Sequence, residues 1–191
     1  MGAMALTSSL VPLGTPATDF TLPDVGGTSH SLGDFTAPVL VVAFVCNHCP
    51  YVKHIEQVFG QIKPTDNLAI VAISSNDVER YPDDAPPRLA EQAERANWTF
   101  PYLVDSDQDV ARAYGAVCTP DFFVYGPDRK LAYRGAFDAS TPGNGKPVTG
   151  ADLANAIGLV AAGQPVPEPH RPSMGCGIKW LPDNAPTGVK Q

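Results

Sequence analysis

The sequence predicts an α/β fold in which helices flank a central mixed sheet, with a β-hairpin before the sheet and an extended tail after it. Three observations lead to this prediction. A Val-rich apolar run at 39–45 indicates a strand that is buried on both faces. Strand-like and helix-like segments then alternate, so the strands they connect should run parallel. An extended tail from residue 163 is indicated by prolines at 165, 167, 169, 172, 182 and 186.

Length and composition favour one compact domain. The chain has 191 residues, and 43% of them are hydrophobic, which is enough for a single core. We expect a disordered N-terminus at 1–13, a folded domain at 14–162 and a tail at 163–191 that packs on the domain. A second methionine at Met4 suggests that the three residues before it are a cloning remnant.

The charge and the N-terminus limit the classes of function. A net charge of −7 without a basic cluster argues against nucleic-acid binding. No apolar run is long enough to cross a membrane. The first residues lack the charged and apolar regions of a signal peptide, so we expect a cytoplasmic protein. In that compartment, the four cysteines indicate catalysis or metal binding rather than a disulfide framework.

The first half of the chain contains a hairpin, two strands and a helix. Short β-prone segments at 19–24 and 28–32 flank Gly26-Gly27, which predicts the hairpin. After the strand at 39–45, apolar residues recur at three- and four-residue steps from Val52 to Ile62. This predicts an amphipathic helix that begins near Cys49 and is ended by Pro64. The run 68–73 predicts a second buried strand.

The second half begins with a polar, proline-rich loop at 76–87. Helices are predicted at 88–97, 107–114 and 151–162, and strands at 100–104, 121–125 and 130–135. Gly115 should end the second of these helices, and Asp105 or Asp107 should cap its start. A Gly/Pro-rich loop at 138–150 precedes the last helix.

The motif Cys46-Asn47-His48-Cys49 is the strongest functional signal. A C-x-x-C pair can be a redox pair, half of a zinc site or a coincidence. Here it lies between a buried strand and a helix, which is typical of a thioredoxin-type redox site. The unpaired N–H groups at a helix start stabilise a thiolate. We expect Cys46 to be that thiolate and Cys49 to close the disulfide with it.

His48 lies between the two cysteines. A cationic side chain there would favour the thiolate and make the pair a stronger oxidant. The alternative is a solvated loop histidine.

Two further cysteines have open roles. Cys118 could be a third redox thiol or an inert buried residue. Cys176 lies between glycines in the tail, which could form a lid that carries a resolving cysteine. The tail could also simply dock through Ile178 and Trp180, and we favour docking.

Several motifs together resemble one family. They are residues 44–53 (FVCNHCPYVK), 118–123 (CTPDFF), 134–135 (RG), 142–147 (PGNGKP) and 172–176 (PSMGC). From residue 14 to residue 180, the chain resembles the peroxiredoxin-like AhpC/TSA branch of the thioredoxin superfamily. This resemblance implies a thioredoxin-like fold. It also implies that Thr119-Pro120 supports the site, with a cis bond that packs against the C-x-x-C and a Thr119 backbone that binds substrate; a trans turn is the alternative.

The chain departs from true peroxiredoxins at one motif. Those enzymes carry Pro-x-x-x-Thr-x-x-Cys, in which the Pro and the Thr shape the peroxide pocket. If their cysteine is aligned on Cys49, Cys46 replaces the Thr and Val42 replaces the Pro. We therefore expect peroxide reduction to be slow.

The function predicted from these observations is thiol–disulfide exchange. Cys46 and Cys49 would act on a protein or small-molecule disulfide, with a separate thiol reductant and without a cofactor or metal. One alternative is a thiol peroxidase that uses Cys176 or Cys118 as the resolving thiol. Another is a copper- or zinc-binding protein with Cys46, Cys49 and either His48 or His54 as ligands.

Overall fold

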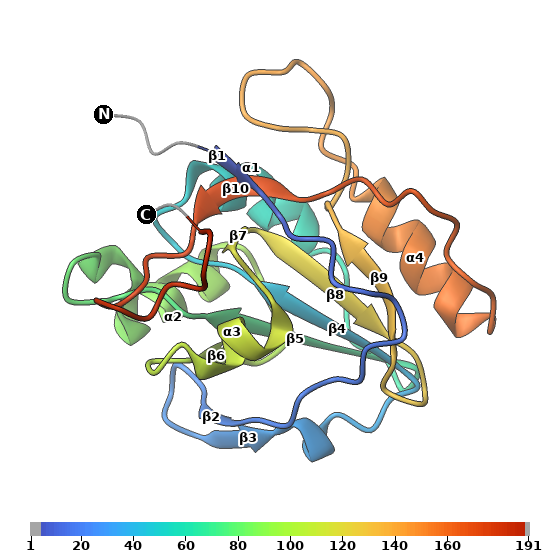
Figure 1. Cartoon of the computed structure of the whole chain (residues 1–191), viewed down its shortest axis with the longest axis horizontal. Coiled ribbons are helices and arrows are strands. Elements are labelled where there is room, and N and C mark those ends of the chain that lie inside the picture. The colour runs from blue at the N-terminus through green and yellow to red at the C-terminus, as the bar shows by residue number, and fades with distance from the viewer. Residues whose placement is uncertain (1–4, 190–191) are drawn as a thin grey trace.

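The central sheet has five strands in the order β6-β5-β4-β8-β9 in the computed structural model, which describes residues 5–189 (Figure 1). β4, β5 and β6 run parallel, whereas β8 and β9 extend the sheet in antiparallel fashion. The strands are β4 (Val39–Phe44), β5 (Leu68–Ser74), β6 (Tyr102–Val104), β8 (Asp121–Tyr125) and β9 (Leu131–Gly135). The predicted α/β class with a mixed sheet is confirmed.

The central strand β4 separates two hydrophobic cores. All six of its residues are buried, as expected for an apolar run without alternation. Val41 faces a core built with α1, α2 and α4, whereas Val42 faces a core built with α3, the N-terminal hairpin and the tail. The helices are α1 (Pro50–Phe59), α2 (Pro86–Arg95), α3 (Asp109–Tyr114) and α4 (Ala151–Ala161). Because β4 is fixed on both faces, the loop that follows it starts from a rigid position.

The helix ends follow the local signals with one difference. α2 begins with two prolines, which are tolerated in a first turn, and α3 ends at Gly115 with φ +70°. Asp105 accepts hydrogen bonds from the first N–H groups of α3, so the predicted capping is confirmed. α1 ends at Phe59 rather than near Pro64. A Cβ at the next residue, Gly60, would lie only 1.9 Å from the Ala96 carbonyl oxygen, so the close packing of this position against the chain near Ala96 requires glycine.

The predicted N-terminal hairpin is present. Its strands are β2 (Thr21–Pro23) and β3 (Ser29–Ser31), which pair in antiparallel fashion. A short 3₁₀-helix, η1 (Leu32–Asp34), follows it. The loop predicted at 76–87 contains a second 3₁₀-helix, η2 (Pro82–Asp84).

A second, small sheet joins the two ends of the chain to the domain. Its strand order is β1 (Ala5–Thr7), β10 (Met174–Gly177) and β7 (Cys118–Thr119), all antiparallel (Figure 1). The expectation of disorder over 1–13 is therefore wrong from residue 5, while residues 1–4 lie outside the described residues. The reason is non-local: β1 gains its backbone partners from β10, about 170 positions later in the chain.

The tail does not remain free of the domain. Beyond β10, Ile178 and Trp180 are buried in the same core as Phe44 and Tyr114.

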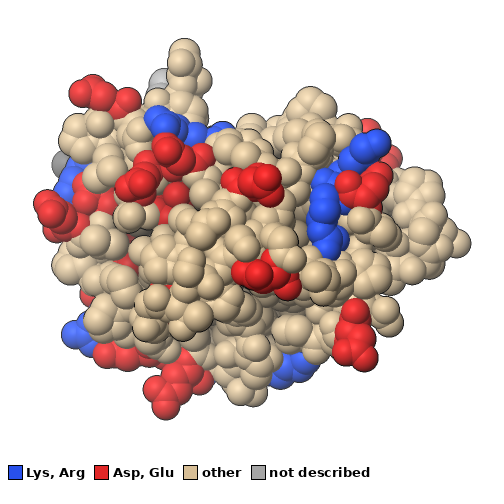
Figure 2. Space-filling model, turned by 90° about the horizontal axis from the view of Figure 1, so that it is seen from below, with Lys and Arg blue, Asp and Glu red and all other residues tan. Residues whose placement is uncertain are grey.

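Basic side chains lie in small groups among acidic ones on the face drawn in Figure 2. Within residues 5–189, no helix combines the length and the apolar character that a membrane span requires.

Candidate active site

The C-x-x-C motif lies between the central strand and the first helix. β4 ends at Phe44, Cys46 lies in the loop that follows, and Cys49 is the N-cap residue of α1. Both cysteine side chains are completely buried. The local layout predicted from the sequence is therefore confirmed, but the sulfur atoms are not open to solvent.

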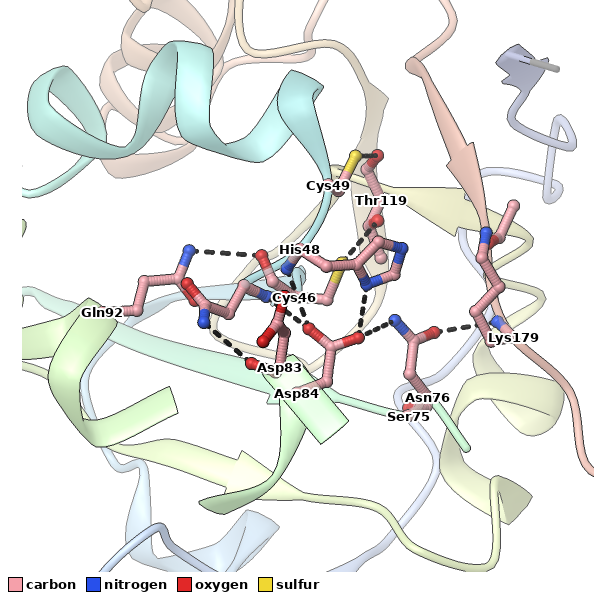
Figure 3. A network of polar contacts seen from close by, with 12 residues as sticks. Cys46, His48, Cys49, Ser75, Asn76, Asp83, Asp84, Gln92, Thr119 and Lys179 are labelled. Atoms are coloured by element: carbon pink, nitrogen blue, oxygen red, sulfur yellow. Dashed lines mark hydrogen bonds and ion pairs between the residues drawn. The ribbon is translucent and has the colours of Figure 1, made fainter. Parts of the chain in front are cut away.

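Thr119 contacts both cysteines (Figure 3). The Cys46 Sγ lies 3.2 Å from the Thr119 hydroxyl oxygen, and the Cys49 Sγ lies 3.3 Å from the Thr119 carbonyl oxygen. The Thr119-Pro120 peptide bond is cis, as predicted. β7 thus supplies one polar partner for each sulfur.

Cys49 lies among hydrogen-bond donors. The Cys176 thiol and then the Cys46 thiol hydrogen-bond to its sulfur and lower its pKa. Burial opposes them, and the backbone N–H groups of Val52 and Cys176 lower the pKa further. Together these groups hold the pKa of Cys49 well below the usual value of a thiol. The Thr119 carbonyl oxygen accepts a hydrogen bond from Cys49 only while that thiol is protonated. The groups that favour the thiolate of Cys49 therefore outnumber this one group that favours the thiol.

Cys46 lies in the opposite environment. Burial raises the pKa of this thiol well above its usual value. Its contact with Cys49 and the negative charge of Asp84 raise it further, whereas the Thr119 hydroxyl opposes them. The directions of these shifts favour a thiolate at Cys49, whereas the sequence led us to expect it at Cys46; which of the two sulfurs attacks first stays a prediction. The physical reason is that the Cys176 and Cys46 thiols and two backbone N–H groups act on Cys49, whereas Cys46 is fully buried beside a carboxylate.

A buried carboxylate, Asp84 of η2, holds the loop between the cysteines. One of its oxygens accepts the N–H groups of Asn47 at 2.8 Å and His48 at 3.0 Å. The other accepts the Asn76 amide at 2.8 Å and lies 2.5 Å from His48 Nδ1. Burial would raise the pKa of Asp84, but the hydrogen bonds from His48 and Asn76 hold it below the usual value.

His48 is thus a paired side chain rather than a freely solvated one. Besides the Asp84 contact, its ring stacks on Tyr81 with the centroids 5.1 Å apart. Asn76 continues the network by accepting the N–H of Lys179 in the tail at 2.8 Å (Figure 3). The loop, η2 and the tail therefore form one polar network.

Helix α2 holds the same loop from another direction. The Gln92 amide donates to the Cys46 carbonyl at 3.2 Å, and the Arg95 guanidinium donates to the Asn47 side chain at 2.6 Å. Glu56 of α1 accepts from both Gln92 and Arg95. Gln92 has no exposed surface, so this is a buried clamp on the backbone of the motif.

Sequence comparison now gives the family of the chain. A sequence model of the AhpC/TSA family matches residues 13–134, which is more than half of the chain. The chain belongs to the AhpC/TSA family. It is 32% identical over 113 residues to MT2597 of Mycobacterium tuberculosis, which is provisionally named a peroxiredoxin; the match covers 59% of this chain and 69% of that protein.

This AhpC/TSA protein is also similar to a protein named for thiol–disulfide exchange and to a protein of solved structure. It is 28% identical over 129 residues to the thiol-disulfide oxidoreductase ResA of Geobacillus thermodenitrificans, covering 63% of this chain and 67% of ResA. The crystal structure of hypothetical protein SMc02350 from Sinorhizobium meliloti is 45% identical with a TM-score of 0.87, and the match covers 92% of this chain and 98% of that one.

The fold itself is thioredoxin-like, as the resemblance implied. The thioredoxin domain of a thiol-disulfide oxidoreductase from Bacteroides vulgatus superposes with a TM-score of 0.57, covering 78% of this chain and 99% of that domain. Its sequence identity is only 18%, so the comparison supports the fold alone.

A cavity of about 360 Å³ lies beside the cysteines of this AhpC/TSA protein. Tyr51 and His54 of α1, Pro120 and Met174 line it, together with the loop at 136–144. Tyr51 and Pro120 are close neighbours in sequence of Cys49 and Thr119. The Nε2 atom of His54 is buried without a hydrogen-bond partner among the described residues. A substrate group could lie in this cavity, next to residues that adjoin Cys49 and Thr119 in the sequence.

One cluster of metal-ligand type is present within residues 5–189. It consists of Cys46, His48 and Asp84, whose ligand atoms lie within 4.8 Å of one another. Cys49 and His54, two of the predicted ligands, do not belong to it. His48 Nδ1 is already engaged by Asp84 at 2.5 Å, so a metal would have to displace that contact.

The structure brings most of the predicted site residues together. Cys176 joins Cys46, Cys49 and Thr119, whereas Cys118 is buried one position away and burial raises its pKa. Sequence reasoning missed Asp84 and Gln92. Each is far from the motif in sequence, and neither belongs to a motif of its own, so only the packing of η2 and α2 identifies them.

Proposed function

We propose that this protein is a thiol–disulfide oxidoreductase whose redox pair is Cys46 and Cys49. One observation carries the proposal: Cys49 is the N-cap residue of α1, and the neighbouring Cys176 and Cys46 thiols lower the pKa of its buried sulfur. The likeness to ResA, whose name states this activity, supports it.

The exchange reaction follows from the roles of the two sulfurs. The Cys49 thiolate attacks a substrate disulfide, which forms a mixed disulfide and releases one substrate thiolate. Cys46 then loses its proton to that leaving thiolate and attacks Cys49, which releases the second substrate group as a thiolate and closes the Cys46–Cys49 bond. A separate thiol reductant restores the dithiol. This order reverses the one expected from sequence, in which Cys46 attacks first.

The test is a redox titration of free thiols in the wild type, Cys46→Ser and Cys176→Ser, with peroxide consumption followed in parallel. We expect wild type and Cys176→Ser to form a reversible Cys46–Cys49 disulfide and to consume peroxide slowly. If Cys46 and Cys49 stay reduced in Cys176→Ser across the titration, the proposal is wrong.

A thiol peroxidase is the second candidate, because the relative MT2597 is named among the peroxiredoxins and Cys176 contacts Cys49 as a resolving thiol would. The residues that replace the peroxide-pocket motif, Val42 and Cys46, argue against it. Rapid peroxide consumption, together with a sulfenic acid trapped on Cys49 in Cys176→Ser, would favour this candidate over the first.

A further inference from the structure

The C-terminal strand β10 lies directly over the redox pair. It pairs with β7 in antiparallel register, with Cys176 opposite Thr119 and Gly177 opposite Cys118. Thr119 is the same residue that contacts Cys46 and Cys49. β1 covers the other edge of β10, so the strand is held on both sides (Figure 1). A substrate cannot reach Cys46 or Cys49, both fully buried, unless this strand moves.

The side chains of three cysteines, Cys46, Cys49 and Cys176, lie together in the interior and belong to the same cluster of buried side chains. The Cys176 thiol, the Cys46 thiol and the backbone N–H of Cys176 all lower the pKa of Cys49. Cys176 itself is only 2% exposed. Cys49 therefore has two thiols in position to form a disulfide with it, one before it in the motif and one from the tail.

We propose that β10 is an internal substrate strand, and that Cys176 competes with Cys46 for the disulfide to Cys49. The proposal rests on the proposed function, because it extends the exchange chemistry of the same pair. If Cys176 and Cys46 compete for Cys49, the oxidised protein has two forms that differ in their disulfide. In the Cys46–Cys49 form, β10 can lift off and expose the site, whereas the Cys49–Cys176 form ties the tail across it.

The interconversion of the two forms is a balanced exchange. The Cys176 thiolate attacks the Cys49 sulfur of the Cys46–Cys49 disulfide. The Cys49–Cys176 bond forms as the Cys46–Cys49 bond breaks, and the electron pair leaves on Cys46. Cys46 takes up the proton that Cys176 released. The number of disulfides is unchanged, so the step needs no further oxidant or reductant.

This arrangement also indicates the class of substrate. β10 presents its cysteine within Met174-Gly175-Cys176-Gly177, as an extended strand paired with Thr119. A Cβ at Gly175 would lie 1.8 Å from the Thr119 carbonyl oxygen, so the contact admits glycine alone. A protein cysteine displayed in an extended segment, next to a residue without a side chain, can occupy the same place once β10 has left.

The first test maps disulfides by mass spectrometry after mild oxidation and alkylation in denaturant. Cys46→Ser should form Cys49–Cys176, and Cys176→Ser should form Cys46–Cys49. Cys49→Ser should form neither bond. If Cys46→Ser keeps Cys49 and Cys176 free under conditions that oxidise Cys176→Ser, this proposal fails while the proposed function stands. If Cys176→Ser cannot form Cys46–Cys49, it is the proposed function that fails.

A second test keeps all four thiols and moves only the strand. Gly175→Ala places a methyl group against the rigid backbone of Thr119, whereas Gly177→Ala meets the flexible end of the Leu6 side chain at 2.8 Å. We expect Gly175→Ala to raise the alkylation rate of Cys49 in the reduced native protein at least about tenfold, a shift of about 1.4 kcal/mol in strand docking. Gly177→Ala, the matched control, should stay within about threefold of wild type.

Equal alkylation rates in Gly175→Ala and wild type would overturn the proposal that β10 guards the site. Circular dichroism of both glycine variants separates strand release from loss of the fold, because β10 contributes little to the secondary structure.

Discussion

Cys46 and Cys49 are three residues apart in one motif, yet the structure gives them opposite surroundings. Cys49 is the N-cap residue of α1, and the neighbouring thiol and N–H groups lower its pKa well below the usual value. Cys46 lies ahead of that helix, where burial, its contact with Cys49 and the charge of Asp84 raise its pKa. The comparison teaches that a C-x-x-C pair does not by itself identify the nucleophile; the helix cap and the nearby carboxylate do.

The largest expected effect is loss of the thiolate itself. Cys49→Ser should abolish the ultraviolet thiolate absorbance of the reduced protein at about pH 5, where a thiol of ordinary pKa is only about 0.03% ionised. Cys46→Ser should keep this absorbance. If the absorbance vanished in Cys46→Ser and survived in Cys49→Ser, the thiolate would lie on Cys46 and the assignment to Cys49 would be wrong.

A second prediction concerns the reduction potential. A stabilised thiolate favours the reduced pair, so the disulfide should be a stronger oxidant than that of thioredoxin, with a potential above about −270 mV. Equilibration of Cys176→Ser with glutathione buffers measures this potential without competition from the tail. A value well below that of thioredoxin would contradict the donor-rich environment assigned to Cys49.

A third prediction concerns Asp84, the carboxylate that holds the loop between Cys46 and Cys49 by hydrogen bonds. In Asp84→Asn, an amide NH₂ replaces one oxygen of a carboxylate that accepts four hydrogen bonds, so donors would face donors. We expect the free energy of unfolding to fall by about 2 kcal/mol. The neighbouring exposed residue offers a matched control, since Asp83→Asn should change stability by less than about 0.5 kcal/mol. Urea denaturation of both variants measures the difference.

The pH dependence of that difference has a definite sign. The pKa of Asp84 is lower in the folded protein than in the unfolded chain, where it is about 3.9. The ionised form therefore contributes its stability above about pH 4, and the contribution is lost as the pH falls through the folded value. The gap between wild type and Asp84→Asn should shrink below about pH 4. A gap that stayed constant would show that the charge of Asp84 is not what stabilises the loop.

The smallest effect is expected at Thr119, which serves the two sulfurs with different atoms. Thr119→Val removes the hydroxyl near Cys46 but keeps the carbonyl near Cys49. We expect the pKa of Cys46 to rise, and its attack on a mixed disulfide to slow about threefold, equivalent to about 0.6 kcal/mol. The thiolate absorbance of Cys49 should not change. Rapid mixing of the reduced variant with a disulfide dye separates the two steps.

The sequence by itself determined much of the frame. The apolar run before Cys46 and the periodicity after Cys49 predicted the central strand and the first helix, and the X-Pro bond at Thr119 was the natural candidate for a cis peptide, with a trans turn as the alternative. These signals succeed because each depends on neighbours in the chain: a buried strand excludes polar residues, a helix repeats about every 3.6 residues, and cis bonds need proline.

The surroundings of each sulfur, and the strand that covers them, come from the tertiary structure. Asp84 and Gln92 reach the motif loop only because η2 and α2 fold against it. Cys176 reaches Cys49 only because β10 pairs with both β1 and β7, which also orders an N-terminus that looked disordered by composition. Such contacts join residues up to about 170 positions apart, and their energy depends on distance and burial in three dimensions, quantities that no local pattern of residues encodes.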